Sequence, residues 1–329
     1  AIGGIISAVL AKNGHDIMMQ TNHPEVKTLC TKEGIRILGY LGEFKQKINT
    51  VLPSDLLNEK FDIVLIATKA TDLIETATKL LPHIKEDSLV VSLQNGICED
   101  ALSEIVGANR TVGCVVGWGA TMIDRGTLEM TSGGFNTIGS INGIEKSQLE
   151  PLRNILNDVV PTHISGNIYG SLYSKLIINS CITTLGAISG LKLGKMLAKK
   201  KIRNIFIEIM REAMAVAKAM ELEVEPYLGK IDYYKFLEKD TFFLRLKQHF
   251  IIRVIGFRFR KLKSSSLQSL ERGKPTEIDF FNGYIAGKAK KFNVPAPVNE
   301  SVVRIVKEIE AGTKQSTTDN FKLPVFDRF

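Results

Sequence analysis

The chain has 329 residues, an apolar content of 44% and a formal net charge of +8 at pH 7. This length predicts two domains rather than one, and the charged content of 24% is ordinary for a globular protein. The aromatic residues are not interleaved with the basic ones as a stacking platform would require, which argues against a nucleic-acid partner. The positive charge is then compatible with a membrane partner, or only with attraction for small anions such as phosphates and carboxylates.

The cysteines and the apolar stretches narrow the class of protein further. No CxxC pair and no histidine at metal-ligand spacing accompanies the four cysteines, Cys30, Cys98, Cys114 and Cys181. This pattern favours a reducing compartment, which we take to be the cytoplasm, and predicts neither a disulfide framework nor a metal site. The most apolar stretch, 172–191, contains Lys175 and Asn179, so it predicts a buried helix rather than a membrane span.

The first part of the chain alternates between strand and helix patterns. A helix is predicted over 1–13, a short buried strand over 15–21, and a continuous β-rich strand over 61–69. A helical pattern follows over 71–84, and a further strand over 88–96. This βαβ rhythm predicts a doubly wound, mainly parallel sheet with right-handed crossovers.

The pattern then changes to short segments separated by glycine. Strands are predicted over 110–122, 126–132 and 135–140, and we expect them to extend the same sheet. A helix is predicted over 146–159, and 161–167 is typical of a last edge strand.

Beyond residue 167 the strand patterns nearly vanish and helical apolar spacing takes over. Helices are predicted over 171–190, 200–222, 238–260, 275–292 and 297–311. The expected architecture is therefore an α/β Rossmann-type domain over 1–167 and an all-α domain over 168–329. The tail, 313–329, is expected to form an irregular strap on the surface.

The opening sequence AIGGIISAVLAKNGHDI has the composition of the second half of a dinucleotide-binding motif. Such a motif runs from a strand through G-x-G-x-x-G into a helix, and its third glycine allows the helix to pack closely on the strand. Gly3 suits this position, because Ser7, Ala8 and Ala11 continue a small-residue face. An ordinary packed N-terminal helix explains the same residues equally well.

The end of the second strand bears on cofactor choice. A carboxylate at this place binds the ribose hydroxyls of NAD, whereas this chain has Gln20, Thr21 and Asn22, followed by His23 and Lys27. Because this position has no carboxylate that could repel the 2′-phosphate of NADP, the sequence favours NADP over NAD. No arginine marks the site, however.

Polar residues follow two of the predicted strands and recur in the helical half. Lys69 in IATKATD and Asn95-Gly96 in SLQNGI come at the carboxyl ends of their strands, where such sheets bind ligands. In SKLIINS, Lys175 and Asn179 are four residues apart and so share one helix face.

One later segment gathers further polar residues around a helix start. SSSLQSLERGKPTEIDFFNG contains Ser265, Glu277, Asp279 and Asn282. Together with the motifs above, this combination resembles the ketopantoate reductase (2-dehydropantoate 2-reductase) family over nearly the whole chain. The resemblance implies a strand ending in G-x-G before the AIGG segment, so that the first strand of the sheet appears missing and Ala1 falls inside the cofactor loop.

The resemblance also implies an activity. Family enzymes use NADPH to reduce an α-keto acid to a 2-hydroxy acid, with ketopantoate and its product pantoate, in pantothenate and coenzyme A biosynthesis, as the leading expectation. Lys175 is then the proton donor to the carbonyl oxygen, and Glu277 assists it. Asn95 and Asn179 hold the substrate, and Ser265 helps to bind its carboxylate.

Cofactor contacts follow from the same resemblance. The positions it assigns to NADP, with NAD as the alternative, are Gly3, Asn22, Lys69, Asn95, Ala120 and Glu277. The chemistry suits these residue types, because hydride addition to a ketone makes an alkoxide that a nearby ammonium stabilises and protonates, worth about 10²–10⁴ in rate.

Each of these residues also has a structural interpretation. A lysine near the start of an apolar helix usually extends to water, and Asn179 could satisfy a backbone group within a helical bundle. Glu277 could be an acidic residue favoured by the positive end of a helix dipole. The joint occurrence of the set in family order favours the catalytic interpretation.

The chain departs from the family pattern at three places. Thr183, expected to contact substrate, stands where many relatives carry a second asparagine, which puts ketopantoate itself in doubt. Ser269 replaces a more common acidic residue, and Asn22 lies where an arginine often grips the 2′-phosphate. A reductase of another keto acid and a catalytically idle dinucleotide-binding relative therefore stay as alternatives.

The expected partners follow from these interpretations. They are a small α-keto acid, no nucleic acid, and, as an open alternative, a second copy of the chain bound through the helical domain. The basic and apolar segment 242–263 is compatible with an amphipathic helix on an anionic membrane. We expect it instead to pack in the helical domain with its cations facing solvent or acidic substrate.

Overall fold

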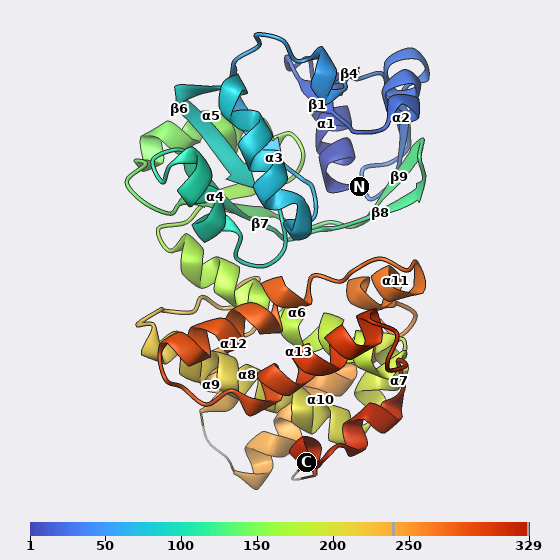
Figure 1. The fold of residues 1–329 in the computed structure, drawn as a ribbon, viewed down its shortest axis with the longest axis vertical. Helices are drawn as coiled ribbons and strands as arrows, with labels where there is room; N and C mark the ends of the chain where they lie inside the picture. The colour runs from blue at the N-terminus through green and yellow to red at the C-terminus, as the bar shows by residue number, and fades with distance from the viewer. Residues whose placement is uncertain (239–240, 328) are drawn as a thin grey trace. The chain divides into compact units, whose positions relative to one another are not determined.

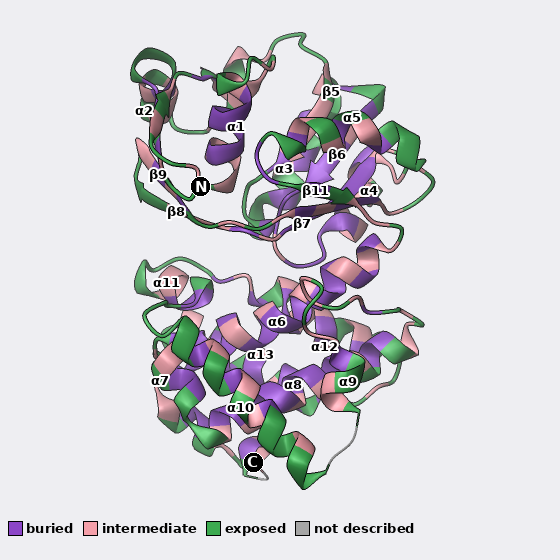
Figure 2. Ribbon diagram, turned by 180° about the vertical axis from the view of Figure 1, so that it is seen from behind, coloured by how far each residue is buried: buried purple, intermediate pink, exposed green. Residues whose placement is uncertain are grey.

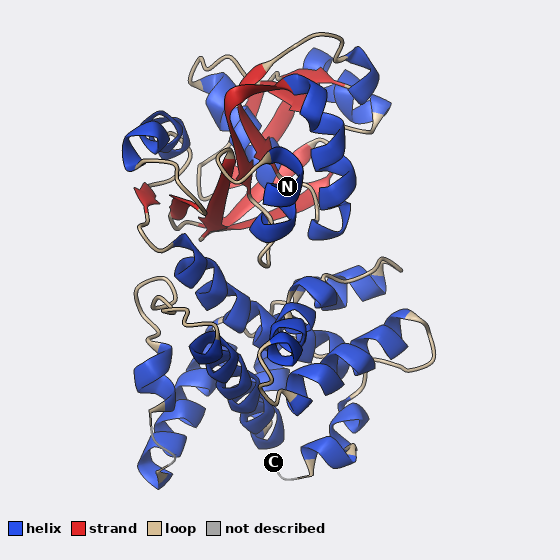
Figure 3. Cartoon of the chain, turned by 60° about the vertical axis from the view of Figure 1, so that its left-hand side comes forward, coloured by secondary structure: helices blue, strands red, loops and turns tan. Residues whose placement is uncertain are grey.

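The computed structural model describes residues 1–238, 241–327 and 329. Part of the predicted helix 238–260 and one residue of the predicted tail thus lie outside the described residues. The chain divides into two compact units, Ala1–Ile168 and Tyr169–Phe329, here called unit 1 and unit 2 (Figure 1). Unit 1 combines strands and helices, whereas unit 2 is drawn entirely as helices and loops (Figure 3). The predicted α/β fold followed by an all-α fold is confirmed.

Unit 1 contains three sheets and the helices that cover them. The helices are α1 (Ile2–Lys12), α2 (Pro24–Thr28), α3 (Leu73–Leu80), α4 (Glu99–Val106) and α5 (Lys146–Asn157). The strands are β1 (Met18–Gln20), β2 (Ile35–Gly39), β3 (Phe44–Gln46), β4 (Asn49–Val51), β5 (Phe61–Ile66), β6 (Ile84–Ser92), β7 (Thr111–Val116), β8 (Gly119–Asp124), β9 (Thr127–Ser132), β10 (Asn136–Ser140) and β11 (Thr162–Ile164).

The main sheet has the order β11-β10-β7-β6-β5, with β5, β6 and β7 parallel. The segment predicted as a last edge strand forms β11, at one edge of this sheet, as expected. The prediction that the glycine-separated segments all extend the same sheet is wrong for 126–132 and for the second half of 110–122, which forms the separate strand β8. Strands β8 and β9 form an antiparallel hairpin that joins β2 and β3 in a separate sheet of order β3-β2-β9-β8.

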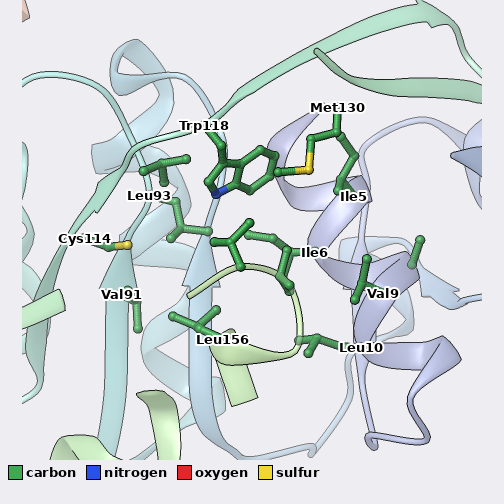
Figure 4. Packing of buried hydrophobic residues seen from close by; sticks show 14 of the residues in the cluster. Ile5, Ile6, Val9, Leu10, Val91, Leu93, Cys114, Trp118, Met130 and Leu156 are labelled. Atoms are coloured by element: carbon green, nitrogen blue, oxygen red, sulfur yellow. The ribbon is translucent and has the colours of Figure 1, made fainter. Parts of the chain in front are cut away.

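The turn between β7 and β8 explains this division. The indole Nε1 of Trp118 donates to Asn136 Oδ1 at 2.9 Å, which anchors the turn to β10. Trp118 is buried in a core with Ile5 and Ile6 of α1, and with Leu93 and Met130 (Figure 4). Beyond this anchor the chain leaves the main sheet, and α1 covers the second sheet.

A third, two-stranded sheet pairs β1 with β4 in parallel. Among the described residues, β1 pairs only with β4, and β5 is the terminal strand of the main sheet. Residues of β1, β5 and α1 line a pocket of about 480 Å³.

Unit 2 is assembled around its first helix. Its helices are α6 (Ile168–Ser189), α7 (Leu193–Ala198), α8 (Lys200–Ala219), α9 (Tyr233–Leu237), α10 (Phe242–Arg258), α11 (Ser265–Glu271), α12 (Asn282–Lys291) and α13 (Pro297–Glu310). The continuous helix predicted over 275–292 is instead a short 3₁₀ turn, Ile278–Phe280, followed by α12. The tail contains two further short 3₁₀ turns and is held by the buried side chains of Phe321 and Phe326.

No helix among the described residues is long and apolar enough to cross a membrane.

A buried polar chain ties four helices of unit 2 together. Thr184 of α6 donates to Asn282 Oδ1, and Asn282 Nδ2 donates to Asn299 Oδ1 at 2.9 Å. Asn299 Nδ2 in turn donates to Glu212 Oε2 at 2.7 Å, and the Glu212 carboxylate also accepts the backbone N–H groups of Val298 and Asn299. Burial raises the pKa of Glu212, while these hydrogen bonds oppose that shift. Each member depends on its neighbours, because an unpaired buried polar group is costly.

We expect Asn299→Ala to lower the free energy of unfolding by about 2–4 kcal/mol, because it leaves the buried Asn282 Nδ2 without its acceptor and removes the side-chain hydrogen bond to Glu212 Oε2. Urea unfolding with an unchanged m value would measure the loss. Arg304→Ala, an exposed position on the same helix, is the control and should change stability little. Equal losses in the two variants would contradict the role given to the buried chain.

Candidate functional site

The carboxyl ends of β5 and β6 lie at one edge of the main sheet. The strands are parallel, with Ile66 opposite Ser92. Just beyond them, Gln94 Nε2 donates to the carbonyl oxygen of Lys69 at 2.9 Å and to Thr68 Oγ1 at 3.2 Å. The structure therefore brings the loop that carries Lys69 beside the loop that carries Asn95.

The Asn95-Gly96 turn has a geometry that glycine favours. Gly96 has a φ of +93°, which is accessible to glycine at little cost. The Cys98 thiol donates to the carbonyl oxygen of Asn95 at 3.7 Å, and the side chain of Asn95 is half-buried. The turn is thus held from behind, and Asn95 keeps part of its surface open.

A buried carboxyl group that the sequence analysis missed lies behind this turn. Glu99, at the start of α4, is 0% exposed and accepts the backbone N–H of Cys98 at 2.9 Å. Its Oε1 has no hydrogen-bond partner among the described residues. Burial raises the pKa of Glu99 to about 8, so it is mostly protonated at neutral pH. Its spacing, three residues after a glycine turn, resembled an ordinary first-turn acid.

Gly3 makes the close contact expected of a helix packed on a sheet. A Cβ at this position would lie 2.8 Å from the Cβ of Ala67, just beyond β5. No side chain caps α1, so its first N–H groups have no side-chain acceptor. Ala120, another expected cofactor position, lies in β8 and packs half-buried against the core.

The loop after β1 is more balanced in charge than its sequence indicates. Asn22 is exposed, as expected of a ligand position. However, Lys27 Nζ lies 2.9 Å from Asp55 Oδ2, and this hydrogen bond holds the pKa of Asp55 below its usual range. His23 Nδ1 lies 3.7 Å from Glu25 Oε1. The two basic side chains that follow the strand, His23 and Lys27, therefore each have a carboxylate nearby.

In unit 2, α6 is buried except at Tyr169 in its first turn and along one stripe farther on. Most of its side chains are inaccessible, whereas the stripe residues Ser171, Lys175, Asn179 and Ile182 are partly exposed. Their spacing of four, four and three residues places them on a single face. Lys175 and Asn179 thus share one face of α6, and it is the face that reaches solvent.

Thr183 is placed differently from these two residues. Its side chain is only 7% exposed, and its hydroxyl donates to the carbonyl oxygen of Asn179 at 2.7 Å. The carbonyl oxygen of Thr183 accepts a hydrogen bond from Ser264 Oγ at 3.1 Å. Ser264 also caps α11 by accepting from the backbone N–H of Leu267 at 3.2 Å. This anchor holds the exposed Ser265, the first residue of α11, beside the end of the α6 stripe.

Glu277 lies on a segment fixed at both ends. Before it, the backbone N–H and hydroxyl of Thr276 each donate to Glu310 at 2.7 Å. After it, Asn282 is fully buried in the polar chain that begins at Thr184 of α6. Glu277 itself is half-buried, whereas Asp279 is exposed and pairs with Lys307. Asp279 and Asn282, which the sequence grouped with the site, are thus engaged in structural contacts.

Unit 1 has a parallel sheet with polar residues at its carboxyl edge, and unit 2 is helical, with a lysine and an amide on the open stripe of α6. Together these features define a Rossmann-type, two-domain protein. The family model described as ketopantoate reductase PanE/ApbA matches residues 1–143, and its C-terminal counterpart matches residues 167–310. The chain belongs to the ketopantoate reductase family, whose members are dinucleotide-binding oxidoreductases.

Individual relatives agree with this assignment. The chain is 30% identical to the 2-dehydropantoate 2-reductase of Pyrococcus abyssi over 316 residues, covering 94% of this chain and 95% of that one. Among solved structures, it is similar to a PanE/ApbA family ketopantoate reductase from Ralstonia eutropha, with a TM-score of 0.78 and 25% identity over 93% of this chain and 94% of that one. A D-mandelate dehydrogenase solved with NADH and anilino(oxo)acetate shares the fold, with a TM-score of 0.80 and 20% identity over 95% and 96% of the two chains.

The raised pKa of Glu99 makes stability depend on pH. The usual pKa of 4.5 is raised to about 8 by burial, so between these values the folded chain keeps a proton that the unfolded chain releases. Stability is therefore lost as pH rises through this window. We expect Glu99→Gln to raise the free energy of unfolding at neutral pH by up to about 3 kcal/mol and to change it little near pH 4.

Urea unfolding across this pH range would measure the difference between Glu99→Gln and the parent. Glu104→Gln, at an exposed position of the same helix, supplies the matched control. A difference that stays constant with pH, or that appears equally in the control, would show that Glu99 ionises normally.

Proposed function

We propose that this protein catalyses the reduction of an α-keto acid to a 2-hydroxy acid with a reduced nicotinamide dinucleotide, NADPH in preference to NADH. The observation that carries the proposal is the α6 stripe, where Lys175 and Asn179 are the basic and amide groups on the open face of a mostly buried helix. The family membership supports the class of reaction, and the names of the relatives support ketopantoate as the leading substrate.

The residues of unit 2 supply complementary chemistry. When bound, the reduced nicotinamide supplies a hydride to the carbonyl carbon. Lys175 stabilises the developing negative charge on the carbonyl oxygen and protonates it. Asn179, one turn away, orients that oxygen, and Ser265 donates to the substrate carboxylate. We propose that Glu277 assists Lys175, because a carboxylate close to an ammonium favours its protonated form.

Thr183 is the observation that favours a second keto acid. Its hydroxyl proton is already donated to the Asn179 carbonyl, so Thr183 offers substrate an acceptor or a methyl group instead of a donor. A substrate with a less polar group than ketopantoate at this position would fit better. An idle dinucleotide-binding relative is the remaining alternative, and it gives no reason for a lysine and an amide to share the open stripe.

The proposed cofactor contacts are in unit 1. The residues fit a dinucleotide, because Gly3 lets α1 approach β5 closely and the first N–H groups of α1 have no side-chain cap. Lys69, Asn95 and Ala120 are the further proposed contacts. Asn22 stands where a carboxylate would favour NAD, which supports NADP as the cofactor. The pairing of Lys27 with Asp55 weakens the preference for NADP, because it offsets a positive charge near the expected 2′-phosphate.

We further propose that the protein acts in the cytoplasm. The support is that all four cysteines are buried free thiols, as is usual in a reducing compartment.

The decisive test is oxidation of NADPH and of NADH, followed by absorbance, with ketopantoate, smaller keto acids and one aromatic keto acid. We expect turnover with at least one keto acid, a higher kcat/KM with NADPH, and a 2-hydroxy acid as product. The assay should compare this chain with one extended before Ala1 by an apolar strand and a Gly-x-Gly turn. We expect the added strand to occupy the pocket that β1 and β5 line and the added glycine turn to improve cofactor binding.

The outcomes separate the alternatives. Turnover of another keto acid without turnover of ketopantoate would assign the substrate as Thr183 indicates. Binding of dinucleotide by both chains with no turnover of any keto acid would contradict the proposal and favour an idle relative.

We expect Lys175→Ala to lower kcat by about 10²–10⁴ with little change in dinucleotide affinity, because it removes the proton donor. Ser265→Ala should instead raise the KM for the keto acid, because its hydroxyl is proposed to hold the substrate carboxylate. Steady-state kinetics and dinucleotide titration would measure both effects.

Lys218→Ala, at an exposed position of α8, is the matched control and should leave kcat unchanged. Full turnover in Lys175→Ala would remove the proposed proton donor. A Ser265→Ala variant that loses only dinucleotide affinity would overturn the assignment of the substrate carboxylate.

A further inference from the structure

We propose that α10 forms a docking face for an anionic lipid surface, in addition to the reaction proposed above. Helix α10 packs only its inner side, including Gln248, Ile252 and Gly256, against unit 2, where it contacts α7 and α8. Much of the rest of the helix is exposed (Figure 2). The segment thus packs in the helical domain with its cations facing outward, as expected, and large apolar side chains face outward beside them.

The exposed side of α10 carries a continuous apolar stripe. Phe243, Phe250 and Phe257 are 81%, 68% and 70% exposed, and Leu246 and Val254 are about half exposed. Their spacing of three, four, four and three residues places all five within an arc of about 80°. Together they expose about 600 Å² of apolar surface, which is at the upper limit of the patches that monomeric proteins normally leave open.

Cations border this stripe on both sides. Lys247 and Arg258 flank one edge and Arg253 flanks the other, as 3.6 residues per turn requires, and all three are exposed. Residues 242–263 contain seven lysines and arginines and no aspartate or glutamate. The neighbouring segment 192–201, which includes α7, adds five lysines and no acidic residue.

A partly buried hydrogen bond between α8 and α10 lies within the same group of positive charges. Arg203 Nε donates to His249 Nδ1 at 3.0 Å, so this nitrogen carries no proton. Burial, and next the charges of Arg203, Lys200 and Arg245, hold the pKa of His249 below its usual value. The cations of α8 and α10 thus act together on one region of unit 2.

Apolar side chains bordered by cations match the boundary of an anionic bilayer. The phenylalanines and aliphatic side chains enter the acyl region, while the lysines and arginines stay among the headgroup phosphates. A second copy of this chain fits less well, because pairing two α10 faces would bring cations against cations. The stripe is also smaller than the roughly 800 Å² per partner of a standard stable interface.

The test is sedimentation of the full chain with vesicles of phosphatidylcholine alone and of phosphatidylcholine mixed with phosphatidylglycerol. We expect binding to the mixed vesicles that weakens as salt is raised, and much weaker binding to phosphatidylcholine alone. Phe250→Ser should reduce the affinity for mixed vesicles by about ten- to a hundredfold, from the lost transfer of one phenylalanine. The double variant Lys247→Gln, Arg253→Gln should reduce it by roughly thirtyfold, at about 1 kcal/mol per cation.

Matched controls separate the face from overall charge and hydrophobicity. Leu57→Ser removes an apolar side chain that is 77% exposed in unit 1, and Lys290→Gln with Lys291→Gln removes two exposed cations of α12. Both controls should keep the parent affinity, and circular dichroism should show all variants folded.

Three results would overturn the proposal. They are no binding to mixed vesicles, binding that does not depend on phosphatidylglycerol or salt, and an equal loss in the controls. Light scattering tests the alternative that a second copy of the chain covers this face. A dimer that Phe250→Ser converts to a monomer would assign the face to a second copy.

Discussion

The burial of α6 on all sides but one is the constraint on which unit 2 depends. Polar groups buried between α6 and its neighbours need hydrogen-bond partners, and residues of α6 supply them. Tyr233 donates to the carbonyl oxygen of Ser174 at 2.6 Å, and Tyr173 donates to that of Ala213 at 2.8 Å. These contacts fix the rotation of α6 about its axis. The open stripe with Lys175 and Asn179 is therefore set by the packing behind it.

Unit 1 depends on a different constraint, the common direction of its parallel strands. Because β5 and β6 run the same way, the loops that follow them emerge at one edge, and Gln94 joins these loops through Thr68 and the Lys69 carbonyl. Strands β1 and β5 also line one pocket, and in the described part of the chain each stands at the edge of its sheet.

The sequence was most informative where a local pattern decides the structure. Long apolar periods predicted α6, α8 and α13, and a continuous β-rich run predicted β5. Its failures share a cause, which is contact between distant segments. The separate sheet of β8 and β9 depends on pairing with β2, and the protonated state of Glu99 depends on burial that no neighbouring residue reveals. The hydrogen bond from the Thr183 hydroxyl to the Asn179 carbonyl is an exception, because it joins residues only four apart, and the sequence predicted Thr183 only as a substrate contact.

Charge shows most clearly why composition and placement must be considered together. The net charge of +8 could be assigned to small anionic ligands while the chain was only a sequence. In the structure, Lys27 near the expected cofactor loop is neutralised by Asp55, whereas the cations of 242–263 have no acidic residue among them and border exposed phenylalanines. The excess charge is therefore concentrated on α10 and its neighbours. A reductase needs a few cations to hold a dinucleotide and a keto acid, and this surplus requires a separate physical explanation.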